Sequence, residues 1–160
     1  MSKRKHKAPA RGDKTITVNK RARHDYLIDE EIEAGIVLEG SEVKSIRDGK
    51  VSLSEAFCAF KRDELFLMQA HIAEYVEAHG RNHLPVRPRK LLLHRRELDK
   101  LKRAVQREGM TIVPLEIYIK GRVLKVAIGL ARGKKEHDKR HSIKAREETR
   151  EMQRALRRRG

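Results

Sequence analysis

The alternation of apolar residues in "MTIVPLEIYIKGRVLKVAIGLARG" constrains the fold more than any other feature of the chain. On either side of a turn at Lys120 and Gly121, every second residue is apolar: Val113, Leu115, Ile117 and Ile119, and then Leu124, Val126, Ile128 and Leu130. A period of two with a tight turn between the runs is typical of antiparallel strands that bury one face. The chain must therefore build a sheet, and other segments must cover it.

The preceding segments predict further short elements. Alternation predicts two strands at about 24–29 and 31–38, and Ser41 is a plausible N-cap for a short helix that ends before Gly49. "EAFCAFKRDELFLMQAHI" has the two apolar runs and the short polar loop of a β-hairpin. The loop "EAHGRNHLPVRPRK" is expected to be ordered only in part. "LLLHRRELDKLKRAVQREG" places its apolar residues on one helical face and ends at Gly109, which predicts a helix.

These elements define the expected fold class. It is mainly β with helices: an OB-like antiparallel β-barrel of about six strands with two or three helices, because short strands with inserted helices and no βαβ rhythm suit that architecture. A flat α+β sandwich is the structural alternative.

The charge distribution divides the chain into three parts. The formal net charge of +16 is made up of +8 over residues 1–24, +2 over residues 25–132 and +6 over residues 133–160. A balance this basic favours polyanionic partners such as nucleic acid. We therefore expect a flexible basic N-terminal arm over 1–18, an OB-like RNA-binding barrel domain over 19–132, and a basic tail over the remainder.

The tail has a weak helical pattern. Four arginines recur every four residues, beside a thin apolar stripe: Arg146, Arg150, Arg154 and Arg158, with Met152, Ala155 and Leu156. This stripe is too small to fold alone, so we expect a tail that is disordered when free and becomes helical on a partner.

Several classes of protein are disfavoured. No stretch approaches the roughly 18 apolar residues of a membrane helix, and the basic N-terminus lacks the apolar segment of a signal peptide. We expect a cytoplasmic protein with no membrane partner, and the single Cys58 allows no internal disulfide.

Motifs for catalysis or metal binding are also missing. The sequence has no GxGxxG, P-loop or GxSxG motif, so we expect no enzymatic activity, no cofactor and no small-molecule substrate. Two H-x3-H spacings, His79 with His83 and His137 with His141, lack the further ligands that zinc requires.

The basic segments favour RNA binding instead. "NKRARH" places Lys20, Arg21, Arg23 and His24 directly before the first expected strand, where a short arm can lie along phosphates. "RPRKLLLHRR" surrounds a leucine run with cations. With no Trp, three Tyr and three Phe, mostly in strand patterns, the chain lacks the stacking platform of single-strand binders, which favours structured RNA.

Four segments in order resemble one known family: "NKRARHDY", "EAGIVLEGSEVKSIRDGKVSL", "RKLLLHRRELDKL" and "LARGKKEHDKR". From about Asn19 to Arg140 the chain is similar to the SsrA-binding proteins, also called small protein B, the bacterial partners of transfer-messenger RNA (tmRNA). The resemblance implies an OB-like barrel without enzymatic activity that acts in trans-translation, the rescue of ribosomes stalled on messages without a stop codon.

The resemblance also implies functional residues. It places tmRNA contacts at Asn19, Glu33 and Leu92, surrounded by the cations Lys20, Arg21, Arg23 and Lys90. In the tail it implies ribosome contacts at Lys134, Lys135, His137, Asp138, Lys139 and Arg140, with Met152 in the thin apolar stripe further along. The implied barrel holds the tRNA-like domain of tmRNA, and the tail enters the vacant mRNA channel.

The implied partners are tmRNA and the ribosome, through small-subunit RNA, the decoding centre and the mRNA channel. Elongation factor Tu and alanyl-tRNA synthetase are implied indirectly, through the RNA. Two alternatives stay open: a general ribosome-associated or initiation-type OB-fold protein, and a metal-dependent OB-fold nuclease with Glu42 and Asp48 as its nearest candidate acids.

Overall fold

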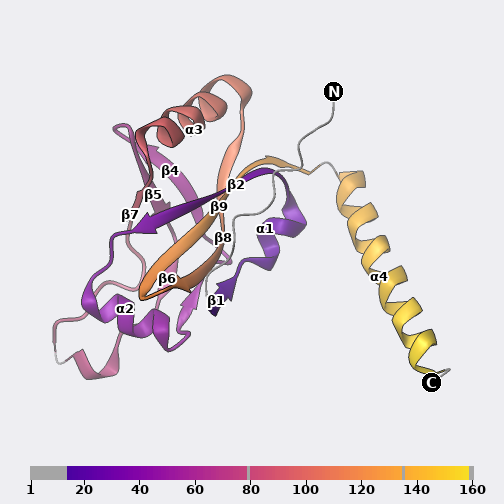
Figure 1. The fold of residues 1–160 in the computed structure, drawn as a ribbon, viewed down its shortest axis with the longest axis horizontal. Coiled ribbons are helices and arrows are strands. Elements are labelled where there is room, and N and C mark those ends of the chain that lie inside the picture. Colours follow the sequence, from indigo (N-terminus) through magenta and orange to yellow (C-terminus); the bar gives the residue numbers. More distant parts are fainter. Residues whose placement is uncertain (1–13, 79, 135, 159–160) are drawn as a thin grey trace.

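The computed structural model describes residues 14–78, 80–134 and 136–158, apart from the side chains of 136–143 and 145 (Figure 1). Its strands are β1 Lys14–Val18, β2 Tyr26–Ile36, β3 Val51–Ser52, β4 Phe57–Lys61, β5 Glu64–Met68, β6 His71–Ile72, β7 Arg89–Leu92, β8 Thr111–Lys120 and β9 Val123–Gly133. Its helices are α1 Lys20–Asp25, α2 Gly40–Arg47, α3 Arg95–Glu108 and α4 Glu136–Arg158, with a 3-10 turn η1 at Val76–Ala78.

The strands pair in a circuit. Hydrogen-bonded neighbours run in the order β8–β4–β5–β7–β2–β9, and β9 pairs back onto β8. The pairings are antiparallel, and β1 shares the other edge of β8 with β4. β3 and β6 form a separate two-stranded sheet. The expected mainly β, OB-like antiparallel architecture is confirmed.

The β8–β9 hairpin confirms the two strands predicted from alternation. Gly121 sits in the turn with φ of 63°, a left-handed conformation that glycine adopts without strain. The alternating apolar residues of β9 lie in the main core as expected: Leu124, Val126, Ile128 and Leu130.

Strand β8 is buried on both faces, which a simple alternation does not predict. Its register with β9 shifts between Pro114 and Glu116. Beyond the shift, Ile117 enters the main core, whereas Val113 and Leu115 before it pack in a second cluster. The second cluster brings Ala22 of α1 onto this strand, so α1 covers the outer face of β8.

Helices α2 and α3 lie where the sequence predicted them. The backbone N–H of Glu39 donates to the carboxylate of Glu42 at 2.9 Å, so Glu39 rather than Ser41 precedes the first turn of α2. Helix α3 ends at Gly109, which has φ of 64°. The hairpin β4–β5 is also confirmed, with its turn at Arg62 and Asp63.

The N-terminal part differs from the expectation. Lys20–Asp25 forms a helix where a strand was expected to begin, because the side chain of Asn19 accepts a hydrogen bond from the N–H of Ala22 and caps a turn. β2 is then one strand with an irregular register near Ile28, not two. The last five residues of the arm expected over 1–18 form β1, and residues 1–13 lie outside the described part.

An ion cluster in the interior fastens the loop after β6 to α2. Arg89 is fully buried, and its guanidinium donates to Glu42 and to the backbone carbonyls of Ala70 (2.8 Å) and Pro85 (3.1 Å). Arg87 donates to the same carboxylate. Burial alone would raise the pKa of Glu42, but the hydrogen bonds from Arg87, the backbone of Glu39 and Arg89 outweigh it and lower the pKa. These two arginines, which are among the cations around the leucine run of "RPRKLLLHRR", are therefore structural.

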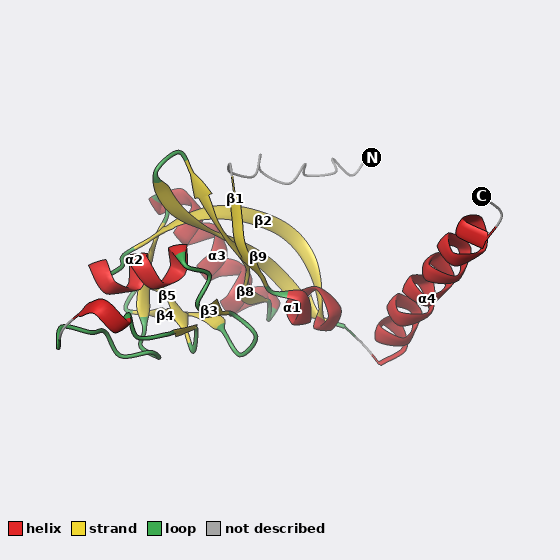
Figure 2. Ribbon diagram, turned by 90° about the horizontal axis from the view of Figure 1, so that it is seen from below, coloured by secondary structure: helices red, strands yellow, loops and turns green. Residues whose placement is uncertain are grey.

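The tail forms helix α4, the conformation predicted for the bound state, and its disorder when free stays a prediction. Helix α4 extends away from the strands (Figures 1 and 2). Each of its described side chains is exposed, including Met152 and Leu156. None of the described helices is both long enough and apolar enough to cross a membrane.

The Glu42 cluster generates the first prediction. We expect Glu42→Ala to lower the free energy of unfolding by about 3–5 kcal/mol, because Arg89 would stay buried without its counter-charge. Asp48→Ala, at an exposed position just after α2, serves as the control and should cost about 0.5 kcal/mol or less. Chemical denaturation measures both, and equal losses would contradict a structural role for the cluster.

Candidate RNA-binding site

Asn19 fastens α1 to the sheet. Its side-chain amide donates to the carbonyl of Pro114 at 2.9 Å, its side-chain oxygen accepts from Ala22 at 3.2 Å, and its backbone N–H donates to Leu115 at 2.7 Å. With an exposure of 4%, the residue positions the cations that follow it. The RNA contact expected at Asn19 stays a prediction.

Helix α1 presents its cations to solvent. Lys20, Arg21 and Arg23 are exposed. Arg21 pairs with Glu55 at 2.8 Å, and Arg23 pairs with Glu31 at 2.9 Å. Exposed ion pairs contribute little to stability, so Arg21 can exchange a carboxylate for a phosphate at small cost. The pair of Arg23 is less exposed, because the side chain of Glu31 is only 16% accessible. His24 is half-buried, with its Nδ1 2.8 Å from Asp25.

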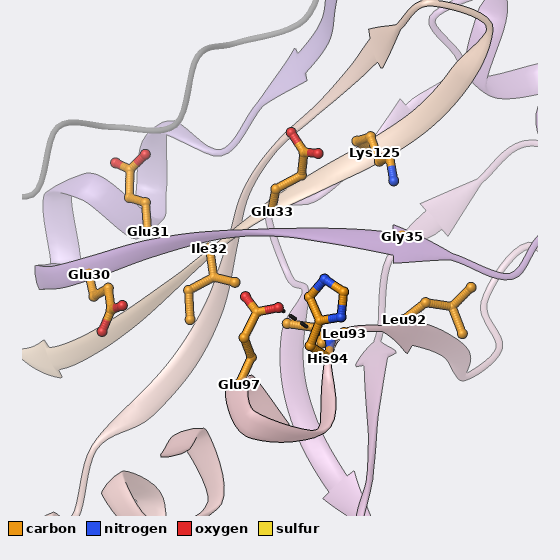
Figure 3. Close-up of a pocket in the computed structure, with 10 residues that line it drawn as sticks. All are labelled: Glu30, Glu31, Ile32, Glu33, Gly35, Leu92, Leu93, His94, Glu97 and Lys125. Atoms are coloured by element: carbon orange, nitrogen blue, oxygen red, sulfur yellow. Dashed lines mark hydrogen bonds between the residues drawn. The ribbon is translucent and has the colours of Figure 1, made fainter. Parts of the chain in front are cut away.

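A groove of about 670 Å³ lies beside α1, across β2 (Figure 3). It brings Glu33 and Leu92 into one surface, although they are far apart in the sequence. The lining residues come from β2, β9 and the segment from β7 to the start of α3: Glu30, Glu31, Ile32, Glu33, Gly35, Leu92, Leu93, His94, Glu97 and Lys125. Because Glu31 lines the groove and also pairs with Arg23, the groove and α1 form one continuous surface.

Leu92 is the apolar part of this surface. It is 50% exposed and follows Lys90 on β7, which pairs with Glu64 at 2.9 Å outside the groove. Gly35 on β2 faces it, and a Cβ built at Gly35 would lie 3.2 Å from the Cβ of Leu92. Glycine at this position therefore lets Leu92 lie against β2.

Glu33 is held as an ionised acceptor. Tyr118 donates a short hydrogen bond to its carboxylate, and Lys120 lies 3.3 Å away. The hydrogen bond from Tyr118 is the main reason that the pKa of Glu33 is lowered, and the charges of Lys120 and Lys125 add to the effect against a smaller cost of burial. For Tyr118, burial and the same bond raise the pKa of the phenol.

The acidic lining determines what the groove can bind. Four of its residues are glutamates, and three of them are ion-paired, to Arg23, Lys100 and Lys120. Their oxygens can accept hydrogen bonds from 2′-hydroxyl groups and base amino groups, which a phosphate cannot donate. Phosphates are better placed on α1 and on Lys120 and Lys125 at the rim. The sequence did not single out Tyr118, Lys120 or Lys125, because their relation to Glu33 depends on the pairing of β2 with β9 and of β9 with β8.

The tail leaves the body through a contact with α1. The backbone N–H of Lys134 donates to the carbonyl of Asp25 at 2.9 Å, and its ammonium group donates to the carbonyl of Arg23 at 3.1 Å. Lys135 lies outside the described residues. His137, Asp138, Lys139 and Arg140 fall in the first turns of α4, and their side chains are likewise outside the described part. The structure thus connects the α1 cations to the start of the tail.

The candidate acids of a nuclease do not form a metal site. Glu42 is fully buried and already bound by two arginines, and Asp48 is exposed at the far end of α2. His83 is bound to Ser41 and to the carbonyl of Ile72. In the described residues, no group of three His, Cys, Asp or Glu is placed to hold a metal ion.

Comparison with known proteins decides the family. A family model described as "SmpB protein" matches residues 16–158. The chain belongs to the SmpB family. The match includes α1, the groove and α4, and it confirms the resemblance drawn from the four sequence segments.

Similar proteins and structures agree with the SmpB assignment. The SsrA-binding protein of Thermobifida fusca (strain YX) is 52% identical over 159 residues, covering 99% of each chain. That of Chloroflexus aurantiacus (strain ATCC 29366 / DSM 635 / J-10-fl) is 53% identical over 160 residues, covering 99% of this chain and 97% of the other. A chain from the structure "tmRNA-SmpB: a journey to the center of the bacterial ribosome" is 50% identical with a TM-score of 0.62, covering 75% of this chain and 85% of that one.

The Tyr118–Glu33 bond generates the second prediction. In Tyr118→Phe, the pKa of Glu33 should rise toward its ordinary value, because the main group that stabilises the carboxylate is removed. A lowered folded-state pKa stabilises the protein above the unfolded-state pKa of about 4.3 and loses that effect as pH falls through the folded-state value. The substitution should therefore cost about 1 kcal/mol at pH 7 and less below about pH 4.

Carbon NMR titration of the Glu33 carboxyl group and denaturation at both pH values measure these effects. Tyr26→Phe is the control, and it should leave the pKa of Glu33 unchanged. An unchanged pKa in Tyr118→Phe would show that Lys120 and Lys125 alone hold the carboxylate ionised.

Proposed function

We propose that this SmpB-family chain is a non-catalytic adaptor that binds the tRNA-like domain of tmRNA and delivers it to stalled ribosomes for trans-translation. The main support for this proposal is that α1 and the groove form one continuous surface. Arg23 of α1 pairs with Glu31 of the groove, and the same groove is lined by Glu33 and Leu92. Such a surface supplies cations for phosphates beside acceptors and an apolar contact for nucleosides. The names of the SsrA-binding relatives and the tmRNA-SmpB structure support this assignment.

The proposed contacts divide by chemistry. Lys20, Arg21 and Arg23 bind phosphates, Glu33 accepts from a 2′-hydroxyl or a base, and Leu92 packs against a nucleoside. Lys90 adds positive charge beside Leu92. The carboxamide of Asn19 acts mainly by holding α1 in place, and His24 helps to fix the last turn of that helix.

The tail is proposed to enter the mRNA channel beyond the decoding centre. Its basic segment, Lys134 to Arg140, contacts small-subunit RNA, with His137 and Asp138 as base-recognition groups and Met152 further along the helix. Elongation factor Tu and alanyl-tRNA synthetase join the assembly through the RNA. Ribosome rescue of this kind takes place in the cytoplasm.

Sequencing the RNA that co-purifies with the intact chain tests the central claim. We expect strong enrichment of tmRNA over total cellular RNA. Association with all ribosomes in equal stoichiometry, without tmRNA, would instead support a general ribosomal OB-fold protein.

The contact of Lys134 with α1 shows where the chain can be truncated to test the role of the tail. A chain that ends after Lys134 keeps both hydrogen bonds to α1 but lacks α4. Its affinity for tmRNA should stay within about two-fold of the full chain, while rescue of stalled ribosomes in a reconstituted translation system should be lost. Parallel loss of tmRNA affinity would mean that α4 contributes to RNA binding.

The salt dependence of binding tests the role of α1. Arg23→Gln should weaken tmRNA binding and reduce the slope of log K against log salt by about one, since one phosphate contact is removed. Arg107→Gln, at an exposed position near the end of α3, is the matched control and should leave the slope unchanged. Filter binding at about 50 to 300 mM salt, where counterion release dominates the salt dependence, measures the slope for both variants.

A further inference from the structure

A second hollow of about 220 Å³ lies on another side of α1 and shares no lining residue with the groove. It is bounded by α1 and by the segment that leads into β4. Its lining residues are Asn19, Arg21, Ala22, Asp25, Tyr26, Ser54, Glu55, Ala56, Phe57 and Val113.

Phe57 gives this hollow an exposed aromatic wall. It is 42% exposed at the start of β4, whereas Phe60 and Phe66, further along the same hairpin, are half-buried. Ala22 and Val113 of the second cluster make an apolar floor. An accessible ring beside a basic helix is the combination on which RNA-binding proteins stack unpaired bases.

The rim of the hollow carries groups that can exchange partners. Arg21 bridges from α1 to Glu55 at 2.8 Å, and its Nε lies 3.6 Å from Asp25. The side chains of Arg21 and Glu55 are 61% and 75% exposed, so water already screens their attraction. If Arg21 turns to a phosphate, Glu55 becomes an acceptor for the amino or ring N–H groups of a base, next to the hydroxyl of Ser54.

We propose that this hollow receives one unpaired nucleobase of a bound RNA, stacked on Phe57. Charge and shape indicate a nucleobase as the ligand. Lys20, Arg21 and Arg23 attract a phosphate backbone to α1, and the ring of Phe57 lies beside them. The inference rests on the proposed function only in taking RNA as the ligand. The base can come from tmRNA or from ribosomal RNA, and the experiment distinguishes the two sources.

The test uses the absence of tryptophan from the chain. In Phe57→Trp the new indole is the sole tryptophan, and a base stacked on it should quench its fluorescence. Val76→Trp, at a position 85% exposed that lines neither hollow, is the matched control and should keep its emission. Each variant is titrated with tmRNA and, separately, with protein-free small-subunit RNA, so that the new indole stays the sole tryptophan in the sample. Quenching by one of them supports the site and identifies the source of the base.

Affinity gives an independent measure. For the RNA that quenches, Phe57→Leu should bind about five- to hundred-fold more weakly, since it keeps apolar bulk but loses the aromatic face, and Phe57→Tyr should bind as the natural chain does. Circular dichroism and unfolding curves verify that the variants fold.

The outcomes separate the two proposals. If the natural chain fails to bind tmRNA, the proposed function falls. If the natural chain binds and Phe57→Trp keeps its full emission with both RNAs, or if Phe57→Leu binds within about two-fold of the natural chain, the base-binding site is overturned while the proposed function stands.

Discussion

The burial of β8 on both faces is the constraint on which the rest of the structure depends. One face carries Ile112 and Ile117 into the main core, and the other carries Val113, Leu115 and Tyr118 into the cluster beneath α1. A strand buried on both faces has to be covered on both, and α1 supplies the second cover. The same strand holds Asn19 through its backbone and sends Tyr118 to Glu33. The basic helix and the ionised glutamate are therefore positioned by one element.

This arrangement explains how an acidic groove can belong to a strongly basic RNA-binding protein. The net charge draws RNA from a distance, but a uniformly cationic surface would hold any phosphate backbone equally well. Glutamates at the centre of the surface offer acceptors that hydroxyl and amino groups can use and that a phosphate, which has no donor, cannot. Arg23 of α1 pairs with Glu31 of that centre, so in the proposed complex charge supplies affinity while the groove constrains the register of the RNA.

The sequence predicted those features that depend on local pattern. Alternation located the β8–β9 hairpin, and left-handed glycine at Gly109 marked the end of α3. Prediction from the sequence failed where contacts between residues distant in the chain determine the structure. Arg89 looked like a surface cation because its partner Glu42 lies 47 positions away, and the bond from Tyr118 to Glu33 spans 85. The candidate RNA contacts Asn19, Glu33 and Leu92 came from a family resemblance, and only the paired strands show why Glu33 is ionised.

Helix α4 illustrates the limit of what this chain can specify by itself. Its described side chains are all exposed, so it gains little stability from packing on the body, and isolated helices depend on length and propensity alone. Its arginines at i, i+4 spacing form one basic row along the helix, and such a row favours an anionic partner. The fixed point is Lys134, bound to two carbonyls of α1. The body therefore determines where the tail starts, while the described side chains of α4 beyond that point are exposed.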